Sequence, residues 1–165
     1  MLMIREATTA DCGLIHDLAW QVFPQTYKDI LSQEQSDYMM HWMYDVENLE
    51  RQMTEEGNVF FIAYDGERPA GYVSVRPDGE DVFHLEKIYV LPEYQKKHYG
   101  SALFRRVLDY VRQRSVGACA VELNVNRSNP ALDFYRRMGM HIDREGDFDI
   151  GHGFYMNDYI MRIEL

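Results

Sequence analysis

Apolar residues recur along this chain with two periods, and segments of the two kinds alternate. Alternating or short continuous apolar runs between turn residues predict strands, whereas spacings of three and four predict amphipathic helices. The strands are expected at residues 3–7, 58–64, 70–75, 82–90, 118–125, 141–145 and 157–165. The helices are expected from Thr8 or Thr9 to Pro24 and at residues 32–43, 46–55, 103–111 and 129–138. This order predicts one mixed α/β sheet with helices on both sides.

The stretch from residue 85 to residue 111 combines three signals. An apolar strand ends at Pro92, and a basic turn with one glycine follows at residues 95–100. A helical stripe then begins, formed by Leu103, Phe104, Val107, Leu108 and Val111. Free backbone N–H groups and the positive end of a helix dipole therefore meet at the turn, which favours a phosphate group.

Composition narrows the class of protein. The 165 residues, of which 46% are hydrophobic and 27% charged, fit one globular domain over residues 1–165. No apolar run approaches the roughly 18 residues of a membrane span, and we expect neither a secretory signal nor a membrane partner. Cys12 and Cys119 lack metal-ligand spacing, so no metal is implied and a reduced, cytoplasmic protein is expected. A net charge of −10 disfavours nucleic acid and favours small cationic molecules.

Two motifs about 30 residues apart carry a resemblance to a known family. The first, Gln95-x-x-His98-x-Gly100, resembles the pyrophosphate turn of the GNAT superfamily of acyl-CoA-dependent N-acyltransferases. The second, residues 129–140 (NPALDFYRRMGM), resembles the second signature of that superfamily. The C-terminal residues 152–165 also resemble polyamine N-acetyltransferases of the PaiA type. His98 stands where the turn usually has its first glycine, and we expect a negative φ there.

The resemblance implies a fold and a set of ligand-binding residues. The fold is a single GNAT-like α/β (α+β) domain, with a mixed, mostly antiparallel sheet whose central strand splays from its neighbour. The backbone of that strand is expected to pair with the pantetheine amides of acetyl-CoA, and the turn to hold its phosphates. The residues expected to bind the cosubstrate are Ile88, Tyr89, Val90, Gln95, Lys96, Lys97, His98, Tyr99, Gly100, Ser101, Asn129 and Tyr135.

Acetyl transfer from a thioester to an amine needs a deprotonated amine, an oxyanion donor and a proton for the departing thiolate. Tyr135 is the candidate for the last role, because its phenol stays protonated at neutral pH and can donate to sulfur. By resemblance it is the tyrosine of the second motif. The alternative is a core tyrosine in a helical stripe. No nucleophile set stands out, so direct transfer is favoured over an acyl-enzyme.

The base is expected on the central strand. Strict alternation would place His84, Glu86 and Ile88 on one face and Leu85, Lys87 and Tyr89 on the other. A histidine and a carboxylate on one face can relay a proton through water. The alternatives are that Glu86 pairs with a cationic substrate or an arginine, or that water alone is the base.

The resemblance implies that residues 24–57 form one wall of the acceptor site. In this segment eight acids stand against Lys28 and Arg51, and aromatic and methionine residues are interleaved. This composition indicates a small amine such as a polyamine, although ordinary amphipathic helices would explain most of these residues. His152 and Tyr155, in an expected loop, are candidates for closing the acceptor site. Two alternatives stay open: a protein N-terminus or lysine as acceptor, and a module that binds acyl-CoA without turnover. A homodimer is compatible with the sequence.

Overall fold

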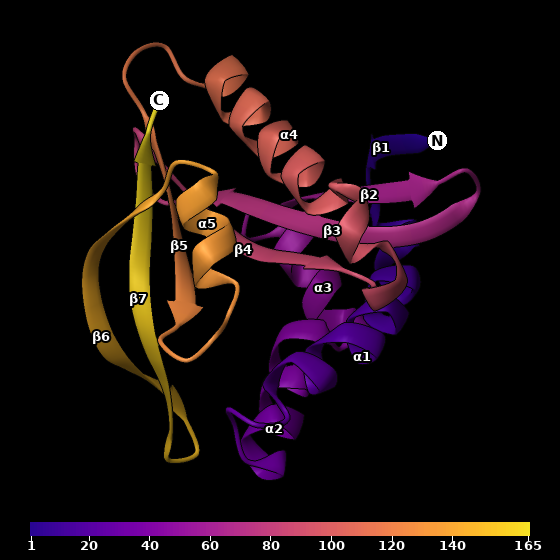
Figure 1. Ribbon diagram of the computed structural model, residues 1–165, viewed down its shortest axis with the longest axis vertical. Helices are drawn as coiled ribbons and strands as arrows, with labels where there is room; N and C mark the ends of the chain where they lie inside the picture. Colours follow the sequence, from indigo (N-terminus) through magenta and orange to yellow (C-terminus); the bar gives the residue numbers. More distant parts are fainter.

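A seven-stranded sheet in the order β1-β2-β3-β4-β5-β7-β6 forms the centre of the computed structural model, which describes residues 1–165 (Figure 1). The strands are β1 (Leu2–Glu6), β2 (Val59–Asp65), β3 (Arg68–Pro77), β4 (Val82–Val90), β5 (Ala120–Asn126), β6 (His141–Gly151) and β7 (Phe154–Glu164). All neighbouring strands are antiparallel except β4 and β5. The expected mixed, mostly antiparallel α/β fold is confirmed.

Strands β4 and β5 diverge after a short parallel contact. Their pairing covers only Val82 to His84 on β4 and Ala120 to Glu122 on β5. From Leu85 onward β4 has no partner strand on this side, and in Figure 1 β4 runs to the right while β5 runs downward. The splayed central strand expected from the sequence is therefore present, and the separation leaves room for a ligand between the strands.

Helices cover both faces of the sheet (Figure 1). One face carries α1 (Cys12–Tyr27), which follows a 3₁₀ turn at Thr9–Asp11, together with α2 (Gln33–Tyr44) and α3 (Val46–Thr54); the other carries α4 (Tyr99–Arg114) and α5 (Leu132–Arg137). A second 3₁₀ helix, η2 (Pro92–Lys97), joins β4 to α4. Between these layers, 36 buried residues form one apolar core. None of the helices is both long and apolar enough to cross a membrane.

Local sequence explains where several helices begin. Ser32, the expected N-cap of α2, accepts a hydrogen bond at Oγ from the Gln35 N–H at 3.1 Å. The expected end of α1 at Pro24 is wrong, because the helix continues to Tyr27. Proline removes one backbone hydrogen bond from the helix. However, Val22 and Phe23 are buried and Tyr27 packs on the Phe23 ring, so packing in the core stabilises the helix beyond Pro24.

The C-terminal hairpin is longer than expected. The patterns at residues 141–145 and 157–165 predict two short strands, whereas β6 and β7 have 11 residues each and meet at a turn around His152. Tyr155 therefore lies in a strand and not in a loop. Almost all residues of β6 are exposed, so its sequence lacks the alternation of apolar and polar residues that would predict a strand.

A β-bulge interrupts β4 at Glu86. Ser74 of β3 pairs with Lys87 while the next residue, Val75, pairs with Leu85, which leaves Glu86 as the additional residue. The expected strict alternation of side chains between the two faces of the sheet is therefore broken at Glu86, which lies on the same side as Lys87. Lys87 and Tyr89 face the α1–α3 layer, where they contact Gln52 and Phe23, and Glu86 points to the same side. Ile88 aligns across the sheet with Phe61, which packs on α4.

Candidate active site

The gap between β4 and β5 opens into a cavity of about 980 Å³. Its walls come from α1, from β4 and β5, from the turn before α4, and from α5 and the loop that precedes it. Its size falls in the range of small-molecule sites, which are usually concave and lined by apolar groups with a few polar ones. The cavity is therefore the candidate active site.

The turn before α4 closes one end of the cavity. Gln95, Lys96, His98, Gly100 and Ser101 line this end, as expected from the sequence. The first N–H groups of α4 have no partners within the helix, and the positive end of a 16-residue helix dipole points the same way. Lys96 forms no ion pair within the chain. This end therefore suits a phosphate group.

The backbone at His98 differs from the expectation. Its φ is +63°, in the left-handed region, and not negative. Left-handed geometry favours glycine, because a side chain there crowds the backbone. His98 therefore adopts, at an energetic cost, a conformation that a glycine would adopt more easily.

Two turn residues point away from the cavity. The Tyr99 hydroxyl donates to Asp65 Oδ1 at 2.9 Å, and Lys97 Nζ lies 3.6 Å from Asp65 Oδ2. Neither residue is among those that line the cavity. Both residues lie in the predicted turn, but their side chains contact Asp65 at the β2–β3 hairpin. Gln95 Nε2 donates to the Val90 carbonyl at 3.1 Å, so that carbonyl is already occupied.

Asn129 and α5 form a further wall of the cavity, which β4 lines from Leu85 to Val90. Asn129 is buried, accepts the Ala131 N–H at Oδ1 (2.9 Å) and donates from Nδ2 to the Tyr27 hydroxyl at 3.3 Å. The regular helix begins at Leu132, later than the expected start at Pro130, because residues 130 and 131 form a turn. Asn129 thus caps that turn and links it to α1.

Tyr135 lines the cavity and is 8% exposed. Its hydroxyl forms no hydrogen bond with the rest of the chain, whereas the hydroxyl of Tyr72, which is also buried, donates to the Tyr44 hydroxyl at 2.8 Å. Burial raises the pKa of the Tyr135 phenol well above its usual value. The group is therefore a protonated donor that faces the cavity without a partner.

Glu86 also lines the cavity, and its carboxylate is held by three donors. Arg76 Nε donates to Oε1, Asn58 Nδ2 donates to Oε2 at 2.8 Å, and Lys87 Nζ lies 3.4 Å from Oε2. Burial alone would raise the pKa of Glu86, but the charge on Lys87 and the bonds from Arg76 and Asn58 outweigh it and lower the pKa. Glu86 is therefore an ionised group and a weak proton acceptor.

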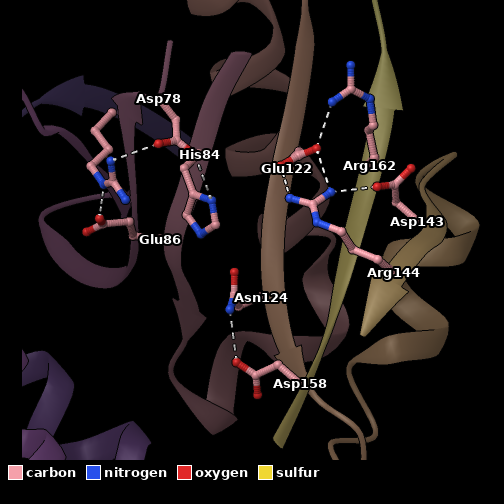
Figure 2. Close-up of polar contacts among 10 residues, drawn as sticks. Asp78, His84, Glu86, Glu122, Asn124, Asp143, Arg144, Asp158 and Arg162 are labelled. Carbon is pink, nitrogen blue, oxygen red and sulfur yellow. Dashed lines mark hydrogen bonds and ion pairs between the residues drawn. The ribbon is translucent and has the colours of Figure 1, made fainter. Parts of the chain in front are cut away.

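His84, expected beside the ligand together with Glu86, is not among the residues that line the cavity. It lies where β4 still pairs with β5, opposite Glu122, and its Nδ1 is 4.0 Å from Asp78 Oδ2 (Figure 2). Burial and the nearby Arg76 lower its pKa, so the ring is neutral at pH 7. Its neighbour Glu122 is bound by Arg144 and Arg162, at 3.0 and 2.7 Å (Figure 2).

Several lining residues were not predicted from the sequence. Gln25, Thr26 and Tyr27 come from the last turn of α1, and Asn124 from β5. The Tyr27 hydroxyl lies 3.4 Å from that of Tyr89, which brings α1 against the central strand. The signal for the α1 residues was hidden by Pro24, which suggested that the helix had ended before them.

A cleft between splayed parallel strands, with a phosphate-type turn at one end and a lone phenol inside, agrees with what the resemblance of the two sequence motifs implies. The model of the acetyltransferase (GNAT) family matches residues 15–140. An uncharacterized N-acetyltransferase of Mycobacterium bovis is 34% identical over 115 residues, covering 68% of this chain and 71% of that relative. The chain therefore belongs to the acetyltransferase (GNAT) family. It is an acetyl-CoA-dependent N-acetyltransferase.

Solved structures show the same fold. The PaiA N-acetyltransferase from Thermoplasma acidophilum, in complex with coenzyme A, has a TM-score of 0.82 at 21% identity over 100% of this chain and 99% of that one. The ribosomal-protein-S18-alanine N-acetyltransferase from Escherichia coli has a TM-score of 0.74 at 17% identity over 99% and 94%. One neighbour is thus named as a PaiA N-acetyltransferase and the other for a ribosomal-protein substrate, and both are under 25% identical to this chain, so the likeness is one of fold.

Proposed function

We propose that the acceptor is the primary amine of a small polycation such as a polyamine, and that the acetyl group passes to it directly. The observation that carries this proposal is a set of contacts that joins α2 to the β6–β7 hairpin next to one side of the cavity. Gln35 Nε2 of α2 donates to the Tyr155 carbonyl at 2.7 Å, and the Tyr38 hydroxyl donates to the Ile150 carbonyl at 2.5 Å. The Tyr38 ring also packs on His152, at 4.7 Å between centroids.

These contacts tie α2 to the tip of the β6–β7 hairpin, two segments that approach each other in Figure 1. A protein acceptor needs an open groove for the residues that follow its reactive amine, whereas a slender amine fits a closed end. The acids of residues 24–57 add a field that attracts cations. Both features favour a small polycation over a protein N-terminus or a lysine side chain.

The residues present fit acetyl-CoA. The N–H groups of the first turn of α4, together with Lys96, would hold its phosphates, and the free edge of β4 from Leu85 would hold its pantetheine amides. Bound acetyl-CoA supplies the thioester carbonyl that the amine attacks. Neither Cys12 nor Cys119 lines the cavity, and both are buried, which supports direct transfer over an acyl-cysteine.

Tyr135 is the proposed general acid, because its protonated phenol has no other partner and lies in the cavity wall. Glu86 is proposed to attract the acceptor ammonium, since it remains ionised beside the cavity. Its low pKa makes it a poor base, so the amine proton is expected to leave through water. His84 takes no part in this scheme.

Release of free thiol from acetyl-CoA, measured against a panel of polyamines, monoamines and peptides, tests the proposal. We expect spermidine-like amines to be the best acceptors, with rates that fall as salt increases because screening weakens exposed charges within about 8 Å at physiological ionic strength. Higher activity with neutral peptides would contradict the proposed acceptor. Acetyl-CoA binding with no turnover of any amine would instead indicate a binding module.

Replacing Glu86 tests its proposed role. Glu86→Gln keeps the shape of the side chain but removes its charge, so kcat/KM for the amine should fall roughly tenfold or more. The KM for acetyl-CoA should stay unchanged, and Asp78→Asn, which alters the other partner of Arg76, serves as the control. An unchanged kcat/KM would return Glu86 to a structural ion pair.

A further inference from the structure

A second, smaller hollow lies beyond the main cavity, between α1–α2 and strands β5 and β7. It measures about 30 Å³ and shares two of its lining residues, Tyr27 and Asn124, with the main cavity. The two spaces are therefore adjacent. A space of this size holds a group about as large as a water molecule, which is also the size of an ammonium group.

Asp158 of β7 is the charged residue of this hollow, and it is only 2% exposed. Oδ2 accepts a hydrogen bond from Asn124 Nδ2 at 3.1 Å, and Oδ1 forms none within the chain (Figure 2). No lysine, arginine or histidine forms an ion pair with Asp158, and the nearby Arg127 is bound to Asp147 at 2.5 Å. Buried charges in proteins are normally paired, so this carboxylate lacks the cation that its burial calls for.

Half of the lining can pack against an alkyl chain. Leu31, Met39 and Met156 are apolar, Tyr27 lines both the hollow and the main cavity, and the polar Gln35 and Asn126 complete the wall. An unbranched amine would therefore meet methyl, methylene and ring surfaces along its chain and one carboxylate at its end. A monoamine of equal length would leave that carboxylate unpaired, which costs free energy.

We propose that Asp158 binds the second ammonium group of a diamine or polyamine acceptor whose first amine is acetylated in the main cavity. The inference rests on the proposed function and adds the residue that selects the acceptor. Burial raises the pKa of the free carboxyl, opposed by the Asn124 bond and the charge of Arg127. A bound ammonium would lower that pKa again and keep the group ionised.

The test compares α,ω-diamines of increasing length with alkyl monoamines of the same lengths. In the unmodified enzyme we expect one diamine length to be preferred over its matched monoamine by roughly tenfold or more in kcat/KM. Asp158→Asn retains the side-chain shape and should reduce that preference to near one, with the KM for acetyl-CoA unchanged. Asp109→Asn removes an equal charge from an exposed site on α4 and should leave the preference intact.

A second variant guards against a folding defect in the first. Leu31→Phe fills the hollow without altering Asp158, and it should also abolish the diamine preference while monoamine turnover persists. Retained preference in either variant, with thermal unfolding near that of the parent, overturns the role of Asp158. If the unmodified enzyme acetylates both amine classes equally, Asp158 is not the selector although the enzyme acts on amines. If it acetylates neither, the proposed function fails as well.

Discussion

Replacing Tyr135 by phenylalanine separates catalysis from folding in this enzyme. The change removes one oxygen from a side chain that is 8% exposed and whose hydroxyl has no partner in the chain. No intramolecular hydrogen bond is lost, so the free energy of unfolding should change by less than about 1 kcal/mol. Acetyl-CoA affinity should also change little, because the ring and its packing on Phe134 remain.

Turnover should respond differently. A positioned general acid typically contributes about 10²–10⁴-fold, which corresponds to roughly 3–5 kcal/mol in the activation barrier. The loss should fall on kcat more than on KM, since the phenol is needed most as charge develops on the departing sulfur. Burial keeps the pKa of Tyr135 above its usual value, so the phenol should not cause an alkaline fall in rate below about pH 10.

The assay is thiol release at saturating acetyl-CoA, with Tyr94→Phe as the matched control. Tyr94 has the same 8% exposure and no hydrogen bond from its hydroxyl, but it stacks on Tyr99 outside the cavity. Its replacement should leave kcat within a factor of about two. If Tyr135→Phe also retained kcat within about threefold, water would have to protonate the thiolate, and Tyr135 would be a core residue.

Three further substitutions test the fold around the site. His98→Gly should raise the free energy of unfolding by up to about 1 kcal/mol in urea, because the left-handed φ of +63° no longer strains a side chain; a loss would show that the imidazole contributes contacts. Gly71→Ala should destabilise the protein by more than about 2 kcal/mol, because its Cβ would lie 2.4 Å from the Tyr89 carbonyl oxygen; an unchanged midpoint would disprove this crowding. Asp11→Asn should lower the free energy of unfolding by about 1 kcal/mol at pH 7 but by little near pH 2, because hydrogen bonds from Arg5 lower the pKa of Asp11 to about 2. The stabilisation by the Asp11 carboxylate is present above about pH 4 and fades as the pH falls. A difference between parent and variant that does not depend on pH would contradict the assignment.

The sequence alone determined the order of the elements and the place of the site along the chain. Local signals suffice for this, because the Ser32 cap, the apolar stripe of α4 and the hairpin at Asp65 each act within a few residues. The strand–turn–helix at residues 85–111 similarly indicates a phosphate site from backbone geometry, and the two family motifs name the chemistry.

Only the tertiary structure decided which side chains meet. The bulge at Glu86 reverses the alternation of β4, and no local pattern marks it because it arises from pairing with β3. Core packing extends α1 past Pro24 and so brings Tyr27 to the cavity. In the sequence Asp158 is an ordinary strand acid. Only the packing of β7 beside β5 and near α2 buries it without a cation, which is the basis of its proposed binding role. Such properties depend on contacts between residues distant in the chain, which a one-dimensional pattern does not contain.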